Sequence, residues 1–212
     1  MNVGQMLLVA LSVVLMLWYF GGMIINRKRG IATYYWLREG LREAVGELTE
    51  ARWLGAGARL VVGEARSPFR RMEVVFRLEA RDILPWWLFQ RLRGHRDYMV
   101  LEAALRTLPP AWEAARAGSP ELRQMQTEGR AKAVDGPHGL TLLLRGKTRE
   151  ADLKPWKAFL ERYGDALISL SVSRRQPHVV LRLSLPPLQA KEEPARAFFE
   201  ALAAACAAAS RR

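Results

Sequence analysis

The sequence predicts an α+β protein in which a single amino-terminal transmembrane helix is followed by a cytosolic antiparallel sheet domain with packed helices. Three observations predict this class. Residues 6–25 contain no charged side chain, which is typical of a membrane-spanning helix. Several short segments then alternate apolar with polar residues and are joined in pairs by turns, as antiparallel hairpins are. Segments with helical periodicity separate these pairs and also close the sequence.

Residues 1–26 are predicted to form a transmembrane anchor. Residues 6–25, at about 1.5 Å of rise each, cross a hydrocarbon core of roughly 30 Å. A cleaved signal peptide is one alternative, but "MNVGQ" lacks a basic residue and "WYFGGMII" lacks an Ala-x-Ala cleavage site. A buried core helix is another, although a core helix without a polar face is unusual in a domain of this size. The anchor residues singled out are Met6, Leu7, Leu15, Trp18, Tyr19, Phe20 and Ile25.

Three cations, Arg27, Lys28 and Arg29, directly follow the apolar run. By the positive-inside rule they predict a single-pass membrane protein with its amino terminus outside and its carboxyl-terminal domain in the cytoplasm. Cys206 is the single cysteine, which excludes an internal disulfide and agrees with a reducing compartment. Its alanine-rich surroundings predict a small packing residue in a helix.

Residues 27–54 are predicted to form a juxtamembrane amphipathic helix that extends the anchor, with a kink expected at Gly30. Apolar residues recur at helical spacing from Ile31 to Leu48, and charges of both signs occupy the other face. The Gly-Ala-Gly sequence at 55–57 is expected to end this helix.

Residues 55–212 are predicted to form the cytosolic α+β domain. Strands are expected at 58–65, 69–80 and 97–105, and hairpins at 127–146 and 166–186, the second turning at "RRQP". Helices are expected at 81–96, 149–163 and 192–212, and a helix or loop at 109–125.

The sequence predicts no catalytic, cofactor-binding or metal-ligating residues and no small-molecule substrate. The three histidines, His95, His138 and His178, are too far apart for ligand spacing and are expected to be solvated turn residues. We find no Walker loop, G-x-S-x-G or G-x-G-x-x-G sequence. A non-enzymatic protein is therefore expected, with an enzyme whose site is dispersed along the chain as the alternative.

The net charge of +12, which is mostly arginine, fits attraction to anionic lipid, ribosomal RNA or other nucleic acid. An arginine-rich composition from a GC-rich genome explains the charge equally well. Two arginine clusters are candidate contacts. Arg66, Arg70 and Arg71 form a candidate phosphate or RNA contact, against the alternative of a solvated sheet edge.

The second cluster lies in "ILPWWLFQRLRGHR", at 83–96, where large aromatic side chains stand beside arginines. Such a helix suits an anionic membrane surface or a membrane protein, and the same chemistry suits RNA. The alternative is that the aromatic residues pack in the core. The candidate interface residues are Trp86, Trp87, Phe89, Arg91, Arg93 and Arg96.

The order of these motifs resembles the calumin family, the coiled-coil-domain-containing single-span subunit of the PAT intramembrane chaperone complex of the multipass translocon. The resemblance covers most of residues 15–187. After the anchor come Ala32, Trp36, Arg38 and Leu41, then the "FRLEARDIL" junction, and later "FLERYGDALISL" and "VVLRLSLP". The matching positions are Arg81, Asp82, Leu84, Phe159, Leu160, Tyr163, Asp165 and Ser169, with Leu167 where the family has Ile.

The resemblance implies a non-catalytic accessory factor for the insertion or folding of multipass membrane proteins. Its expected partners are the membrane, translocon or insertase subunits or a small multipass membrane protein, and the ribosome with its RNA. The family's acidic lumenal region and its Lys/Glu-rich tail do not appear here, so calcium binding and tail-mediated ribosome docking do not carry over. The alternative is a membrane-tethered structural or regulatory domain that binds anionic lipid or a membrane-protein partner without the ribosome.

Overall fold

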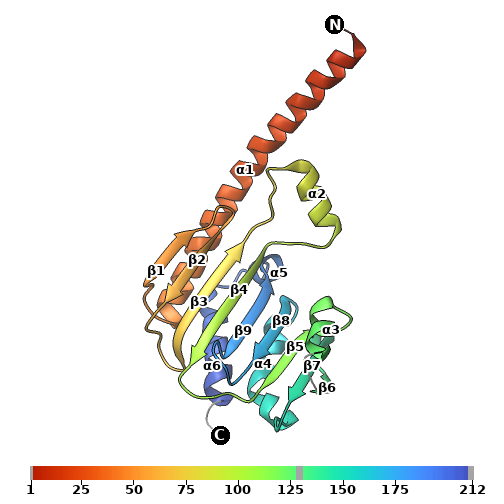
Figure 1. Cartoon of the computed structure of the whole chain (residues 1–212). Coiled ribbons are helices and arrows are strands. Elements are labelled where there is room, and N and C mark those ends of the chain that lie inside the picture. The colour runs from red at the N-terminus through yellow and green to blue at the C-terminus, as the bar shows by residue number, and fades with distance from the viewer. Residues whose placement is uncertain (1, 128–130, 210–212) are drawn as a thin grey trace.

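The computed structural model describes residues 2–127 and 131–209. Within these residues, nine strands form one sheet in the order β1-β2-β3-β4-β9-β8-β5-β7-β6, and neighbouring strands are antiparallel (Figure 1). The predicted α+β class is therefore confirmed. The strands are β1 (Glu50–Trp53), β2 (Gly57–Val62), β3 (Phe69–Arg77), β4 (Tyr98–Leu105), β5 (Trp112–Arg116), β6 (Ala131–Asp135), β7 (Leu140–Arg145), β8 (Leu167–Val172) and β9 (Val179–Ser184).

The helices are α1 (Val3–Ala44), α2 (Leu84–Leu92), α3 (Pro120–Thr127), α4 (Lys154–Tyr163), α5 (Leu185–Gln189) and α6 (Ala195–Ala209), with short 3-10 turns at Pro137–Gly139 and Glu150–Leu153. Both predicted hairpins and the predicted helices at 81–96, 149–163 and 192–212 are present. Parts of the predicted 127–146 hairpin and 192–212 helix, residues 128–130 and 210–212, lie outside the described residues.

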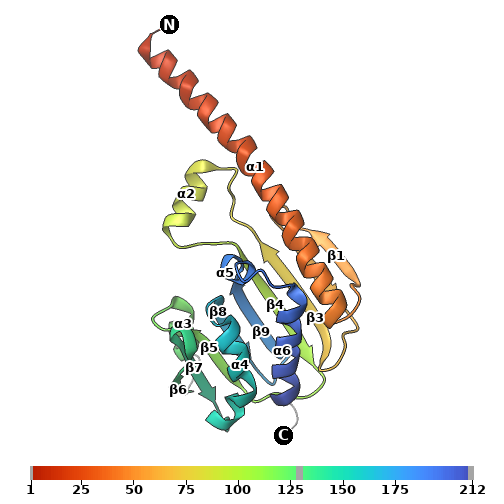
Figure 2. The ribbon, with the colours of Figure 1, turned by 180° about the vertical axis from the view of Figure 1, so that it is seen from behind.

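The carboxyl-terminal half of α1 packs with α4 and α6 on one face of the sheet (Figure 2). Strand β3 shows how the sequence selects this face: Met72, Val74 and Phe76 are buried, and the residues between them are more exposed. Helix α3 lies on the opposite face, where Leu122 packs against strand residues of β5 and β7. The core is densest in a group of fully buried aromatic residues, Trp112, Trp156, Tyr163, Phe198 and Phe199.

The helix predicted over 27–54 ends ten residues early, at Ala44, and runs through Gly30 without interruption. Gly46 ends it, because its backbone adopts a φ of +148° and its N–H donates 2.9 Å to the carbonyl of Leu41. Residues 50–53, expected to be helical, form the edge strand β1 on β2. Gly55 and Ala56 lie in the turn between these two strands, and Gly57 is the first residue of β2. Hydrogen bonding along the sheet edge outweighs the helical propensity of Glu50–Trp53.

Residues 109–125, expected to form a helix or loop, contain strand β5, which lies inside the sheet, third from the β6 edge. Residues 112–115 of this strand are buried and pair on both sides, with β7 and β8. A strand buried on both faces has no alternating pattern, and its alanines favour a helix by propensity. Its place in the sheet therefore comes from pairing with distant strands.

The amino-terminal part of α1 extends away from the sheet (Figure 1). Its most apolar 18-residue stretch has a mean hydropathy of 2.3 and is 6% buried, so this helix is long and apolar enough to cross a membrane. This exposure contradicts the core-helix alternative.

Candidate functional site at the junction of α1 and α2

The segment from Glu79 to Asp97, which includes α2, lies against α1 where that helix leaves the sheet (Figure 1). We call this contact region the junction. The contacts of α1 in the junction come from one stripe of the helix, whose residues are spaced four apart. The indole Nε1–H of Trp18 donates 2.8 Å to the carbonyl of Arg81, and Asn26 Nδ2 donates 2.9 Å to the carbonyl of Glu79. Between them, Gly22 lets the chain pass closely, since a Cβ there would lie 2.3 Å from the carbonyl oxygen of Arg81.

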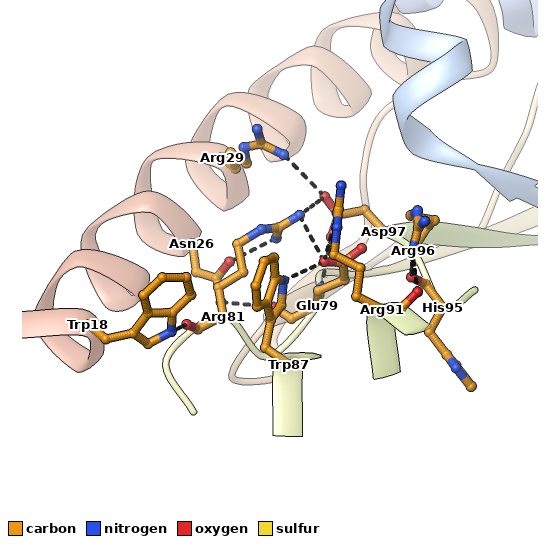
Figure 3. A network of polar contacts seen from close by, with 10 residues as sticks. All are labelled: Trp18, Asn26, Arg29, Glu79, Arg81, Trp87, Arg91, His95, Arg96 and Asp97. Carbon is orange, nitrogen blue, oxygen red and sulfur yellow. Dashed lines mark hydrogen bonds and ion pairs between the residues drawn. The ribbon is translucent and has the colours of Figure 1, made fainter. Parts of the chain in front are cut away.

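A buried charge network lies inside the junction (Figure 3). The carboxylates of Glu79 and Asp97 are 3% and 5% exposed. Arg81 donates 2.7 Å to Asp97 Oδ2 and 3.0 Å to Asn26 Oδ1. The backbone N–H of Glu79 donates 2.7 Å to Asp97 Oδ1, and Trp87 Nε1–H donates 2.8 Å to Glu79 Oε2. Buried carboxylates are stable only when paired in this way, so the network holds the junction in one geometry.

Two further arginines stand at the rim of this network. Arg29 lies 3.6 Å from Asp97 and Arg91 lies 3.7 Å from Glu79, and their side chains are 57% and 48% exposed. With Arg81, three guanidinium groups therefore face two carboxylates, which leaves one positive charge at the rim.

Helix α2 has no buried residue, which contradicts the core-packing alternative for its aromatic residues. Trp86 and Phe89 stack on each other at 5.7 Å and face outward, and Leu92 is 80% exposed. Trp87 alone of the three predicted aromatic residues turns inward, with its ring 5.3 Å from that of Trp18. Of the predicted arginines, Arg91 lies over Trp87 and Arg93 over Phe89, and Arg96 donates to the backbone carbonyls of Arg91 and His95.

The predicted anchor residues other than Trp18 are exposed: Met6, Leu7, Leu15, Tyr19, Phe20 and Ile25 are each 40–66% exposed. The cations Arg27 and Lys28 are exposed beside the junction. Two grooves flank α1 here. One of about 620 Å³ separates α1 from α2, and one of about 610 Å³ lies between α1 and the turn that joins β1 to β2.

The predicted cluster of Arg66, Arg70 and Arg71 lies at the other end of the domain. Arg66 donates to the carbonyls of Glu43 (2.6 Å) and Val45 (2.7 Å), at the carboxyl end of α1. Glu43 follows Trp18 by 25 residues, or about 37 Å along the helix. Arg70 and Arg71 are exposed beside it. The arginines at 66–71 and those at 91–96 therefore lie at opposite ends of the domain and do not form one basic surface.

In the described part of the chain, no three of the His, Cys, Asp and Glu residues lie close enough together to hold a metal ion. His178 is buried, contrary to expectation, and its Nδ1 accepts 2.8 Å from the N–H of Leu105. This bond caps the end of β4 where β9 begins.

Sequence reasoning missed Gly22, Glu79 and Asp97 as determinants of the site. The one signal concerns Gly22: the spacing of Trp18, Gly22 and Asn26 places three unlike residues on one helical stripe at the end of the apolar run.

A scan against protein-family models and a search of curated proteins found no match for this chain.

Proposed function

We propose that the protein is a non-enzymatic accessory factor that α1 anchors in a membrane, and that the junction lies in the cytoplasmic leaflet and contacts membrane proteins there. The observation that carries this proposal is the apolar outer surface of α2 beside the apolar part of α1. Trp86, Phe89 and Leu92 are 48%, 44% and 80% exposed, and such aromatic and aliphatic surface is typical of a membrane or partner contact.

The depth of α2 follows from its attachment to α1. If residues 6–25 fill the hydrocarbon core, Trp18 lies about 10 Å inside its inner boundary, because seven residues separate it from Ile25. The hydrogen bond from Trp18 to Arg81 and the Trp18–Trp87 contact then bring α2 to the same leaflet. Arg93 and Arg96, further along, reach the headgroups.

The orientation rests on Arg27, Lys28 and Arg29, which the positive-inside rule assigns to the cytoplasmic side. The role in insertion or folding of multipass proteins rests on the resemblance to the calumin family and on the α2 surface. The proposed partners are translocon or insertase subunits or a small multipass membrane protein. The proposed ribosomal RNA contact is formed by Arg66, Arg70 and Arg71. Arg66 bonds to Glu43, which lies about 37 Å from Trp18 along α1.

The leaflet position is tested by a polarity-sensitive fluorophore attached to Leu92→Cys in the full chain in liposomes, with Arg66→Cys as the matched control. Burial raises the pKa of the Cys206 thiol well above its usual range, so the natural cysteine does not compete for the label. We expect a blue-shifted emission at 92 that lipid-borne quenchers reduce, and an aqueous spectrum at 66. An aqueous spectrum at 92 contradicts the proposal.

The partner is tested by a photo-crosslinker at position 86 in native membranes, where we expect adducts with multipass membrane proteins. Ribosome co-sedimentation is expected to weaken with salt and to be lost when Arg66, Arg70 and Arg71 are changed to Glu. Adducts with lipid alone and no ribosome binding favour the alternative, a membrane-tethered structural or regulatory domain that binds anionic lipid.

A further inference from the structure

We infer that the groove between α1 and α2 binds one anionic phospholipid, with its phosphate between Arg29 and Arg91 and an acyl chain along Val14, Leu17 and Gly21. This inference rests on the proposed membrane position of α1. It assigns to the junction a ligand of its own, distinct from the membrane-protein partner proposed above.

The charge at the rim selects an anion. Arg81 is 12% exposed and is committed to Asp97 and Asn26 by hydrogen bonds of 2.7 and 3.0 Å. Arg29 and Arg91 instead stand 3.6 and 3.7 Å from their carboxylates, at ion-pair rather than hydrogen-bond distance, with about half of each side chain in solvent. Each guanidinium has five N–H donors in a planar fork that fits phosphate oxygens. One negative charge at this point balances the three cations against the two carboxylates.

The rest of the groove selects a hydrocarbon chain. Val14, Leu17 and Ile25 line it and are 54%, 68% and 47% exposed. A Cβ placed on Gly21 would meet no atom within 4 Å, so this glycine opens the groove rather than packing against protein. The volume of about 620 Å³ is in the range of pockets that hold small organic ligands.

The two ends of the groove lie in the order that a lipid requires. Arg29 follows Ile25, the last residue of the apolar run, by four residues, which is about 6 Å or one helical turn. The cations therefore stand at headgroup depth and the apolar lining lies deeper in the leaflet. By contrast, the groove on the other side of α1 is lined by Arg27 and Asp82, whose charges offset each other.

The test is native mass spectrometry of the full chain in detergent, titrated with phosphatidylglycerol, phosphatidylcholine or inorganic phosphate. We expect one phosphatidylglycerol bound in preference to phosphatidylcholine, and no competition by millimolar phosphate. The double variant Arg29→Gln, Arg91→Gln is expected to lose about tenfold or more in affinity for phosphatidylglycerol, as the loss of charged hydrogen bonds predicts. Arg42→Gln, an exposed arginine further along α1 whose partner is the exposed Glu47, is the matched control and is expected to bind normally.

Gly21→Leu fills the groove and is expected to lower the affinity for both lipids, whereas Gly4→Leu, an equally open glycine outside the groove, is expected to bind as the natural chain does. The comparison of the two glycine variants tests lipid binding in the groove even if the arginine variant does not fold. Equal lipid binding by Gly21→Leu and Gly4→Leu, or displacement of lipid by inorganic phosphate, overturns the inference. If lipid binding fails in this way but the fluorophore at position 92 still reports a lipid environment, the proposed function stands. An aqueous spectrum at position 92 contradicts both the proposed function and the lipid site.

Discussion

The indole N–H of Trp18 donates a hydrogen bond of 2.8 Å to the backbone carbonyl of Arg81, 63 residues further along the chain. This bond joins the apolar part of α1 to the segment that precedes α2. With the bond from Asn26 to the carbonyl of Glu79, it determines where α2 stands relative to the apolar helix. The first prediction concerns the glycine between these two donors.

Gly22→Ala is expected to release the segment from α1, because the new Cβ would lie 2.3 Å from the carbonyl oxygen of Arg81 and 2.8 Å from the backbone nitrogen of Asp82. Limited trypsin digestion measures the release, since Arg81, Arg91, Arg93 and Arg96 are all cleavage sites in this segment. Cleavage should become several-fold faster. Gly21→Ala, where a Cβ meets no atom within 4 Å, is the control. Equal digestion of the two variants would contradict the close packing at Gly22.

Gly40→Ala is expected to destabilise the whole domain by about 2 kcal/mol, the usual cost of overpacking a core contact. A Cβ at Gly40 would lie 2.4 Å from the Cβ of Ala195 and 2.8 Å from the backbone nitrogen of Arg196, where α1 meets α6. Gly30→Ala on the same helix places its Cβ 3.5 Å from Trp53, an ordinary contact, and should stabilise by up to about 1 kcal/mol through helix propensity. Denaturant unfolding in detergent measures the free energy of unfolding of both variants. A change of the same sign in both would contradict the close contact of Gly40 with α6.

Arg81→Met is expected to cost about 3 kcal/mol of stability, because it removes the main partner of two buried carboxylates. Adding Asp97→Asn to this variant should restore part of the loss, since one of the uncompensated charges is then removed. Arg93→Met replaces an exposed arginine directly after α2 and should change stability by less than about 0.5 kcal/mol. Thermal unfolding of the four proteins measures these differences; a loss at Arg93 equal to that at Arg81 would argue against a buried network.

The Glu73 carboxylate is expected to make stability depend on pH. Its pKa is lowered, first by the hydrogen bonds from Arg59, which are 2.6 and 2.7 Å long, and then by the positive charges of Arg59 and Arg71, while partial burial opposes the shift. A carboxyl whose folded pKa is depressed stabilises the fold above its unfolded pKa of about 4, and that contribution is lost as the pH falls through the folded pKa.

Glu73→Gln should therefore be about 1 kcal/mol less stable than the natural chain at pH 7, and the difference should vanish at an acid pH below the lowered folded pKa. Glu47→Gln is the control. Glu47 also forms an ion pair, with Arg42, but both side chains are well exposed, so little change in stability is expected. Denaturant unfolding at both pH values provides the comparison. A difference at Glu73 that persists unchanged in acid would mean that the ion pair is not its source.

The elements that the sequence predicted well are those with local patterns. The hairpin of β8 and β9 follows from alternation along both strands and from the turn residues between them. Strand β5 was missed because nothing local distinguishes Trp112–Arg116 from a helix, and its two partner strands come later in the chain. The edge strand β1 was missed for a related reason: Glu50–Trp53 pairs only with β2 and is exposed throughout.

At the site, the sequence identified the aromatic and arginine residues of α2 but not how they are held. Trp18 was expected to serve as an anchor residue, and Trp87 as an interface residue or, in the alternative, a core residue. Their contact, and the pairing of Arg81 with Asp97, join parts of the chain whose spacing has no periodic signal. Such contacts follow from the packing of α1 on the sheet, which the sequence pattern does not encode locally.

Helix α1 is continuous from Val3 to Ala44, so one rod links the apolar tip to the hydrophobic core. A domain on a flexible linker adopts many orientations relative to its anchor. Here the helix is continuous, so a rotation or tilt of its amino-terminal end rotates or tilts the sheet by the same angle. A molecule that binds residues 3–17 and fixes their orientation therefore also fixes the rotation of the sheet about the axis of α1. It fixes the position of Arg66, Arg70 and Arg71 along that axis as well. In the proposed membrane arrangement, one orientation of α1 therefore determines both which molecules meet its apolar end and which meet the sheet.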